Sequence, residues 1–180
     1  MKNYLIIVVA IIFATTITTY SQSMFADEGE FGAAVIGGFQ FYENSRVEAY
    51  GASATIGGII EVGVAISEPI NFAYTSVKIL SKNKLKGFLN VGLSNGLNNN
   101  IFLFGFSIAP QYELLAGISF FPTLELSIPA NLPHNFIVSL DFSILFFKTI
   151  VVSPSISYTP NSDMIFGLNF ALIYLFRRNK

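Results

Sequence analysis

The chain has 180 residues, of which 52% are hydrophobic and only 12% carry a charge. Soluble domains usually hold about 25% charged residues, so this chain has too few to cover a water-facing surface. Beyond the N-terminus, no run of about 18 uncharged apolar residues lacks proline, glycine or clustered polar residues, which argues against a helical membrane protein. The net charge of −1 gives no reason to expect a nucleic-acid partner, and the absence of cysteine excludes disulfides, thiolate chemistry and cysteine-based metal sites.

The first 23 residues have the layout of a cleavable secretory signal. Lys2 precedes an apolar stretch over residues 5–14, and small residues follow at Ser21 and Ser23. We expect cleavage after Ser23, with Ser21 as the alternative. An uncleaved anchor helix is a second interpretation, but the stretch is shorter than the roughly 20 residues that span a bilayer. Residues 24–180 are therefore predicted to form one domain outside the cytoplasm.

Residues 136–147, FIVSLDFSILFF, alternate with the period of a β-strand. One face is wholly apolar, and the other carries Asp141 between Ser139 and Ser143. The same kind of alternation recurs in residues 60–67, 85–94, 101–109, 118–128, 150–158 and 166–176. Residues 70–80 change phase near Ser76, which predicts a bulge there.

Nine short polar breaks divide the mature chain into ten segments of about nine to thirteen residues, the length of a tilted strand that crosses a bilayer. The breaks are residues 43–46, 57–58, 67–69, 82–84, 94–100, 110–113, 129–134, 147–149 and 159–163. Pro122 and Pro154 fall inside predicted strands, where a proline usually marks a bulge or a strand end.

The face opposite the apolar one decides which solvent surrounds the strands. It consists mostly of Ser, Gly, Ala, Thr and Asn, with roughly one ionisable residue per strand. A soluble barrel would carry charged residues at most of these positions, whereas small polar residues are typical of the lumen of a membrane barrel. The prediction is an all-β fold, a transmembrane antiparallel up-and-down β-barrel of about ten strands, with eight as the alternative. A soluble periplasmic β-barrel is the competing architecture.

Charged and aromatic residues indicate how the predicted barrel is oriented in the membrane. If the chain starts on the periplasmic side, the mature cations other than Arg46 lie at or near the periplasmic end. They include Lys78, Lys82, Lys84, Lys86, Lys148, Arg177, Arg178 and Lys180. Because tryptophan is absent, the aromatic girdles at the two interfaces would consist of Phe and Tyr residues such as Tyr42, Tyr50, Tyr74, Tyr158 and Tyr174.

Five ionisable residues are predicted to face the lumen. They are Glu48, Glu61, Lys86, Glu125 and Asp141. They would form either a polar path for solutes or a cluster of ion pairs, since a buried charge needs a partner. Phe88, Phe121, Tyr50 and Ile137 are also expected to point inward and to fill a narrow lumen. The leading hypothesis is a structural or surface-interaction role without enzymatic activity, and the alternative is a narrow channel for small solutes.

A single histidine, His134, lies in a predicted outer loop. Outer-membrane lipid-modifying enzymes combine a histidine with a serine and an acid or amide, and Ser139 and Asp141 lie nearby in sequence. An outer-membrane lipid-modifying enzyme is therefore a further alternative. A loop histidine without an evident partner is more often simply solvated, so we predict no catalytic residue, cofactor or metal site.

Over residues 30–176 the chain resembles small outer-membrane β-barrels of the kind related to the transmembrane domain of outer-membrane protein A, which have eight to ten strands. Gly167, Phe170 and Leu172 have the Gly-x-x-aromatic-x-apolar spacing of that family's C-terminal assembly signal, although RRNK follows Phe176 where the family commonly ends on an aromatic residue. The resemblance implies a monomer that contacts outer-membrane lipids, periplasmic chaperones and the barrel-insertion machinery.

Overall fold

The computed structural model describes residues 25–42, 45–67, 70–96, 99–130, 135–160 and 164–177. Most of these residues belong to eleven strands: β1 (Glu30–Tyr42), β2 (Ser45–Ile56), β3 (Ile60–Ser67), β4 (Ile70–Lys82), β5 (Leu85–Gly96), β6 (Asn99–Pro110), β7 (Tyr112–Leu115), β8 (Ile118–Pro129), β9 (Ile137–Phe146), β10 (Ile150–Tyr158) and β11 (Ile165–Arg177). No helix within the described ranges is long and apolar enough to span a membrane. The predicted signal peptide and His134 lie outside the described residues.

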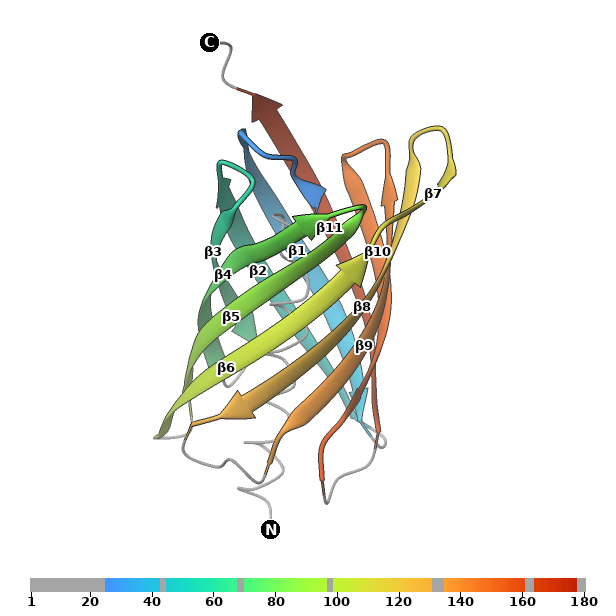
Figure 1. The fold of residues 1–180 in the computed structure, drawn as a ribbon. Helices are drawn as coiled ribbons and strands as arrows, with labels where there is room; N and C mark the ends of the chain where they lie inside the picture. The colour runs from blue at the N-terminus through green and yellow to red at the C-terminus, as the bar shows by residue number, and fades with distance from the viewer. Residues whose placement is uncertain are drawn as a thin grey trace.

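The strands form one antiparallel sheet that closes on itself (Figure 1). From β6 the sheet runs through β5, β4, β3 and β2 to β1, then through β11, β10 and β9 to β8, which also pairs with β6. β7 prolongs β6, since both pair with β8. The described residues thus build a closed barrel with ten strand positions, which confirms the predicted fold and its larger strand count.

Tight turns join strands at the end of the barrel where β1 begins and β11 ends, which we call the turn end. In the described chain, two consecutive residues have positive φ at positions 57–58, 83–84 and 147–148. This is the pattern of a type I′ hairpin turn, whose twist matches that of the flanking strands. The turns confirm the breaks predicted at residues 57–58, 82–84 and 147–149. We call the opposite end of the barrel the loop end.

The break predicted at residues 110–113 is wrong. The chain passes from β6 through Gln111 into β7, and it reverses only at Ala116 and Gly117. Gly117 has a φ of 82°, a left-handed conformation that suits glycine. The hairpin of β7 and β8 therefore continues the wall at the turn end (Figure 1).

Two prolines explain why β6 and β7 are separate strands. β8 pairs with β6 on one side of the gap and with β7 on the other, in the same register. In that register Pro110 stands opposite Pro122. Neither proline has an N–H to donate, so the ladder is interrupted without any slip of the strands. Pro154, in contrast, lies inside β10, and its pairing with β11 continues through it.

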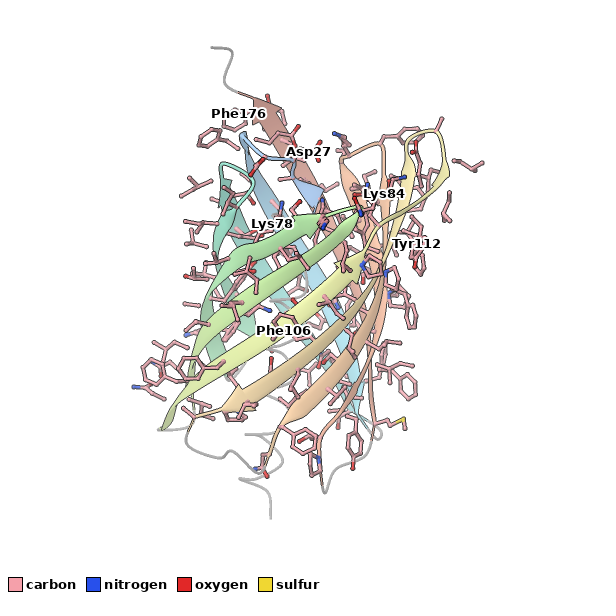
Figure 2. All side chains as sticks on the ribbon, in the orientation of Figure 1. Asp27, Lys78, Lys84, Phe106, Tyr112 and Phe176 are labelled. Carbon is pink, nitrogen blue, oxygen red and sulfur yellow. The ribbon has the colours of Figure 1, made fainter. Side chains whose placement is uncertain are left out.

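Side chains alternate between the outside and the inside of the barrel, as predicted. In β9, Leu140 is 40% exposed whereas Asp141 is fully buried. Large apolar side chains point outward around the whole barrel (Figure 2). Examples from successive strands are Val35, Val62, Leu89, Phe104, Leu126, Leu140, Ile156 and Leu172. This is the arrangement of a barrel whose outer surface meets lipid.

β4 departs from the predicted pattern. Phe72 and Tyr74 are buried, at 5% and 3% exposure, so Tyr74 is not a girdle residue. The register with β5 shifts between Lys78 and Leu80, which places the bulge slightly beyond the predicted position near Ser76.

The other tyrosines separate into groups. Tyr50 is 61% exposed and points outward, so it does not fill the lumen. Tyr158 and Tyr174 also point outward, at 45% and 70% exposure, in positions compatible with the girdles. The side chain of Tyr42 lies outside the described set.

Two neighbouring substitutions in β9 test which face of the strand meets lipid and which faces the lumen. We expect Leu140→Asp to impair insertion, because a carboxylate on the lipid face costs about 2 kcal/mol. We expect Asp141→Leu to insert as the wild type does, because this side chain does not meet lipid. The fraction of heat-modifiable, folded protein in outer-membrane preparations measures both. Equal tolerance of the two substitutions would contradict the barrel.

Candidate functional site in the barrel lumen

The inner wall of the barrel has three layers. In β9 the inward side chains run from Ile137 through Ser139, Asp141 and Ser143 to Leu145. The strand is thus apolar at the loop end, polar in its middle and apolar at the turn end. We call the middle layer the polar belt; its inward residues are Asn90, Ser107, Thr123, Glu125, Ser127, Ser139, Asp141, Ser143, Ser153, Ser155, Ser157 and Asn169.

Two clusters of buried apolar residues flank the polar belt. The loop-end cluster comprises Ala49, Ala65, Phe72, Tyr74, Ile101, Leu103, Ile137 and Ile165. The turn-end cluster comprises Phe25, Ala34, Ile36, Phe88, Ala109, Phe121, Leu145, Val151, Ala171 and Ile173. Phe88, Phe121 and Ile137 therefore point inward as predicted. Aromatic side chains narrow the lumen toward both ends, whereas the belt is lined mainly by small residues.

Serine hydroxyls join neighbouring strands within the polar belt. Ser143 Oγ donates a hydrogen bond of 2.9 Å to Ser153 Oγ, from β9 to β10. Ser139 Oγ and Ser157 Oγ lie 2.8 Å apart in the same pair of strands. These bonds satisfy polar groups that would otherwise be costly to bury. Ser139 thus has a structural partner. The alternative in which Ser139 acts with His134 stays a prediction, because His134 lies outside the described residues.

Four of the five predicted ionisable residues lie inside the barrel. Glu61, Glu125 and Asp141 are buried, and Lys86 is 7% exposed. Glu61 accepts a hydrogen bond of 2.7 Å from the hydroxyl of Tyr74 across β3 and β4. Lys86 Nζ lies 5.7 Å from the ring centroid of Phe121, in the geometry of a cation–π contact. Lys86 therefore belongs to the turn end, whereas Glu125 and Asp141 belong to the polar belt.

Glu48 does not face the lumen, which corrects its predicted position. Its carboxylate accepts a hydrogen bond of 2.7 Å from the Tyr50 hydroxyl and is paired with the guanidinium of Arg46. Residues two apart in a strand share a face, and Tyr50 is the exposed member of this set. Tyr50 is also one of the predicted girdle residues, and that prediction already implies an outward position for Glu48, two residues before it in the same strand.

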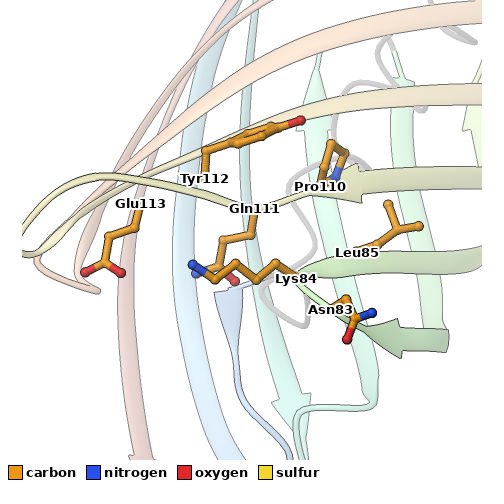
Figure 3. A pocket seen from close by; sticks show the side chains of 7 residues that line it. All are labelled: Asn83, Lys84, Leu85, Pro110, Gln111, Tyr112 and Glu113. Atoms are coloured by element: carbon orange, nitrogen blue, oxygen red, sulfur yellow. The ribbon is translucent and has the colours of Figure 1, made fainter.

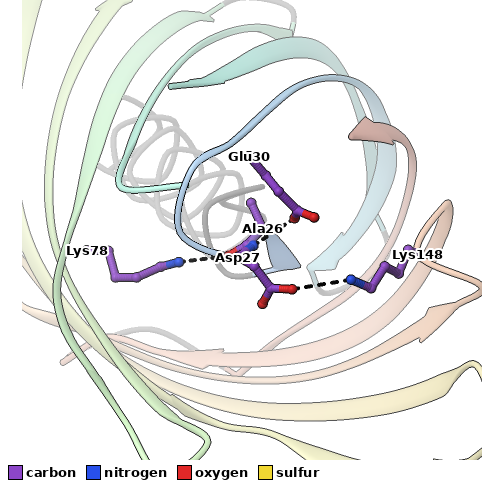
Figure 4. A network of polar contacts seen from close by, with 5 residues as sticks. All are labelled: Ala26, Asp27, Glu30, Lys78 and Lys148. Atoms are coloured by element: carbon purple, nitrogen blue, oxygen red, sulfur yellow. Dashed lines mark hydrogen bonds and ion pairs between the residues drawn. The ribbon is translucent and has the colours of Figure 1, made fainter. Parts of the chain in front are cut away.

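A short segment that precedes β1 crosses the mouth of the barrel at the turn end (Figure 4). We call residues 25–29 the strap. The Phe25 ring packs edge-on against Phe121, with centroids 5.0 Å apart. Lys78 Nζ donates a hydrogen bond of 2.8 Å to the carbonyl oxygen of Ala26.

An ion pair holds the strap to a different part of the rim. Lys148 Nζ lies 3.3 Å from Asp27 Oδ2. Lys78 belongs to β4 and Lys148 to the turn after β9, so the two lysines contact the strap from different sides of the mouth (Figure 4).

The backbone of the β2–β3 turn also contacts the strap. Gly29 N donates to Gly57 O at 2.9 Å. A Cβ at Gly58 would lie only 1.9 Å from the carbonyl oxygen of Asp27, so only glycine admits the strap here.

Two hollows lie at the turn end. One, of about 250 Å³, lies beside the strap between Asp27, Lys78 and Lys86. The other, of about 400 Å³, is an open notch between the β4–β5 turn and β7, lined by Lys84, Tyr112 and their neighbours (Figure 3).

No group of three His, Cys, Asp or Glu side chains among the described residues is placed to hold a metal ion.

The predicted assembly-signal residues all lie in β11. Phe170, Leu172 and Phe176 point outward, at 42%, 61% and 50% exposure. Gly167 faces inward, where a Cβ would lie 2.3 Å from Ser155 Oγ. The terminal strand therefore presents its aromatic and apolar residues on the outer surface.

Solved structures match this architecture, whereas no family model and no curated protein matches the sequence. The KdgM porin aligns with a TM-score of 0.50 and 7% identity, over 77% of this chain and 98% of the porin. The translocator domain of the autotransporter NalP from Neisseria meningitidis aligns with a TM-score of 0.50 and 9% identity, over 94% of this chain and 96% of the domain. At such identities the likeness establishes the fold, which is that of outer-membrane β-barrels.

The buried hydrogen bond between Tyr74 and Glu61 can be tested by removing its donor. We expect Tyr74→Phe to lower the free energy of unfolding by about 1–3 kcal/mol, because a buried carboxylate loses a hydrogen bond. The urea midpoint of the folded protein in detergent measures the change. Tyr158→Phe, on the outer surface, is the matched control and should leave the midpoint unchanged. Equal midpoints for both variants would show that the bond contributes nothing.

Proposed function

We propose that this chain, a β-barrel of the outer-membrane type, is a structural component of the bacterial outer membrane, closed to solutes at rest and without enzymatic activity. The observation that carries the proposal is the strap. Phe25 adds a third aromatic ring to Phe88 and Phe121 at the turn end, and two lysines hold the segment in place. A mouth crossed in this way does not serve free diffusion.

The outer surface supports the proposed location. Large apolar side chains recur on strands around the barrel, and a closed barrel leaves no backbone N–H or C=O of a strand edge unpaired in lipid. Outer-membrane lipids are then the main partner of the protein. Delivery by periplasmic chaperones and recognition of β11 by the barrel-insertion machinery follow from the resemblance to small outer-membrane barrels. A monomer suffices, because the barrel closes within one chain.

A narrow channel is the second candidate, and one observation favours it. The polar belt is built mainly from Ser, Thr and Asn side chains, which are small and able to hydrogen-bond water. A barrel that served only as a rigid body could fill this layer with larger side chains. The belt and the strap thus point to different functions, and conductance distinguishes between them.

The closed resting state predicts silence in planar lipid bilayers. We expect wild-type protein purified from outer membranes to give no stepwise currents in 1 M KCl, since the strap blocks the turn end. The measurement is single-channel recording, with folded protein verified by heat-modifiability and a known porin as the positive control. Sustained currents from the wild type would refute the closed state and favour the channel.

The absence of enzymatic activity predicts that His134 is dispensable. We expect wild type and His134→Ala to release no fatty acid from phospholipid vesicles above the level of protein-free vesicles. Mass spectrometry of extracted lipids measures release and acyl transfer together. Activity in the wild type that is lost in His134→Ala would instead establish the lipid-modifying enzyme.

A further inference from the structure

We propose that the strap is a displaceable stopper, and that its displacement opens a pore for small cations through the polar belt. This inference goes beyond the structural role and rests on that proposal only for the closed resting state. It assigns distinct tasks to three parts of the molecule. The wall spans the membrane, the strap closes the wall, and the belt selects the solute.

The strap makes no part of the wall. β1 starts at Glu30 and is paired with β11 from that residue onward, whereas pairing with β2 starts at Gly32. Residues 25–29 lie before these ladders and pair with no strand. Removing the strap from the mouth therefore breaks no strand ladder, and the barrel can stay closed in the membrane while its mouth opens.

The contacts of the strap are few and of unequal strength. The ion pair between Asp27 and Lys148 is exposed, with side chains 59% and 61% accessible, and exposed pairs contribute little to stability. Phe25 is 3% exposed, and its edge-on packing on Phe121 is the main apolar anchor. The strap therefore depends on one buried ring, on the hydrogen bond from Lys78 to the Ala26 carbonyl oxygen and on the close fit of its backbone against Gly58.

The distribution of charge beneath the strap favours cations. Glu125 and Asp141 belong to the polar belt, and Glu61 lies on the same inner wall. The inward lysines of the described residues, Lys78 and Lys86, lie at the turn end beside the strap. A solute that has passed the mouth thus meets a wall with fixed carboxylates and no lysine or arginine among the belt residues. Carboxylates that line a pore favour cations over anions.

Two glycines supply a matched test of the stopper. Gly58→Ala pushes a Cβ against the Asp27 carbonyl oxygen, whereas Gly57→Ala adds the same methyl group to open space. Their φ angles are 66° and 62°, so the two substitutions carry similar backbone strain. We expect stepwise currents in planar bilayers from Gly58→Ala, at least tenfold more frequent than from Gly57→Ala or the wild type.

Phe25 gives an independent second pair. Phe25→Asp should expel the ring from the turn-end cluster and open the pore, whereas Phe25→Leu should keep it shut. In a tenfold KCl gradient, the reversal potential of Phe25→Asp should have the sign of a potassium-selective pore. Adding Asp141→Asn to Phe25→Asp should move the reversal potential toward zero. Heat-modifiability verifies that each variant is folded.

Each outcome bears on a separate part of the proposal. Folded Gly58→Ala and Phe25→Asp that remain silent would overturn the stopper and leave the closed structural barrel intact. Equal currents from wild type and Phe25→Asp would refute the stopper and the closed resting state together. Anion selectivity would overturn the assignment to cations. Failure of Phe25→Asp to fold would also overturn the proposal, because the strap would then be part of the wall's stability.

Discussion

The hydrogen-bonded ladder between β1 and β11 is the contact on which the rest of the structure depends. Lipid offers no partner to a backbone N–H or C=O, so a sheet inside a membrane must have no open edge. The two terminal strands meet this requirement over pairs that run from Glu30 with Arg177 to Phe41 with Phe166. Their register also keeps inside and outside consistent where the sheet closes, because a slip of one residue would turn Ala34 and Ile36 of β1 toward lipid.

Much of this fold could be predicted because most strands obey a single rule. Where one face is apolar and the other is small or polar, as in β9, alternation alone identifies inside and outside. β4 defeats the rule, since Phe72 and Tyr74 point inward while polar Asn71 and Thr75 occupy the other face. A bulge then shifts the phase. The polarity of a side chain therefore predicts whether it points inward or outward only in strands whose lipid-facing and lumen-facing residues differ in kind.

Other differences between prediction and structure have local causes. Residues 110–113 contain a proline and polar residues, which are typical of a turn, but opposing prolines can interrupt a ladder without ending the strand. The strap escaped prediction because residues 25–29 have no periodicity, and a segment of that kind is placed only by its tertiary contacts. The acids of the lumen were predictable one by one. Their grouping into a belt was not, because it depends on how neighbouring strands are staggered.

The interior of the barrel holds acidic side chains although it lies inside a membrane. Buried carboxylates are costly unless hydrogen bonds or cations compensate them, and the Tyr74 hydroxyl bonded to Glu61 shows one compensation. Apolar clusters of the wall flank the belt toward both ends. Such layering strengthens electrostatic interactions within the belt, because water screens them less. The protein thus keeps carboxyl groups inside a membrane by surrounding them with small hydroxyl groups and flanking them with apolar residues.

The facing prolines Pro110 and Pro122 have a mechanical consequence. A ladder without hydrogen bonds at one level is a compliant line in the wall, and beside it lies the notch next to β7. A barrel that is stiff all round answers a thinner or thicker bilayer by tilting or by deforming the lipid. We expect this barrel also to yield along the line of the two facing prolines. A response of the wall to bilayer thickness would then reach the turn end, where the strap lies.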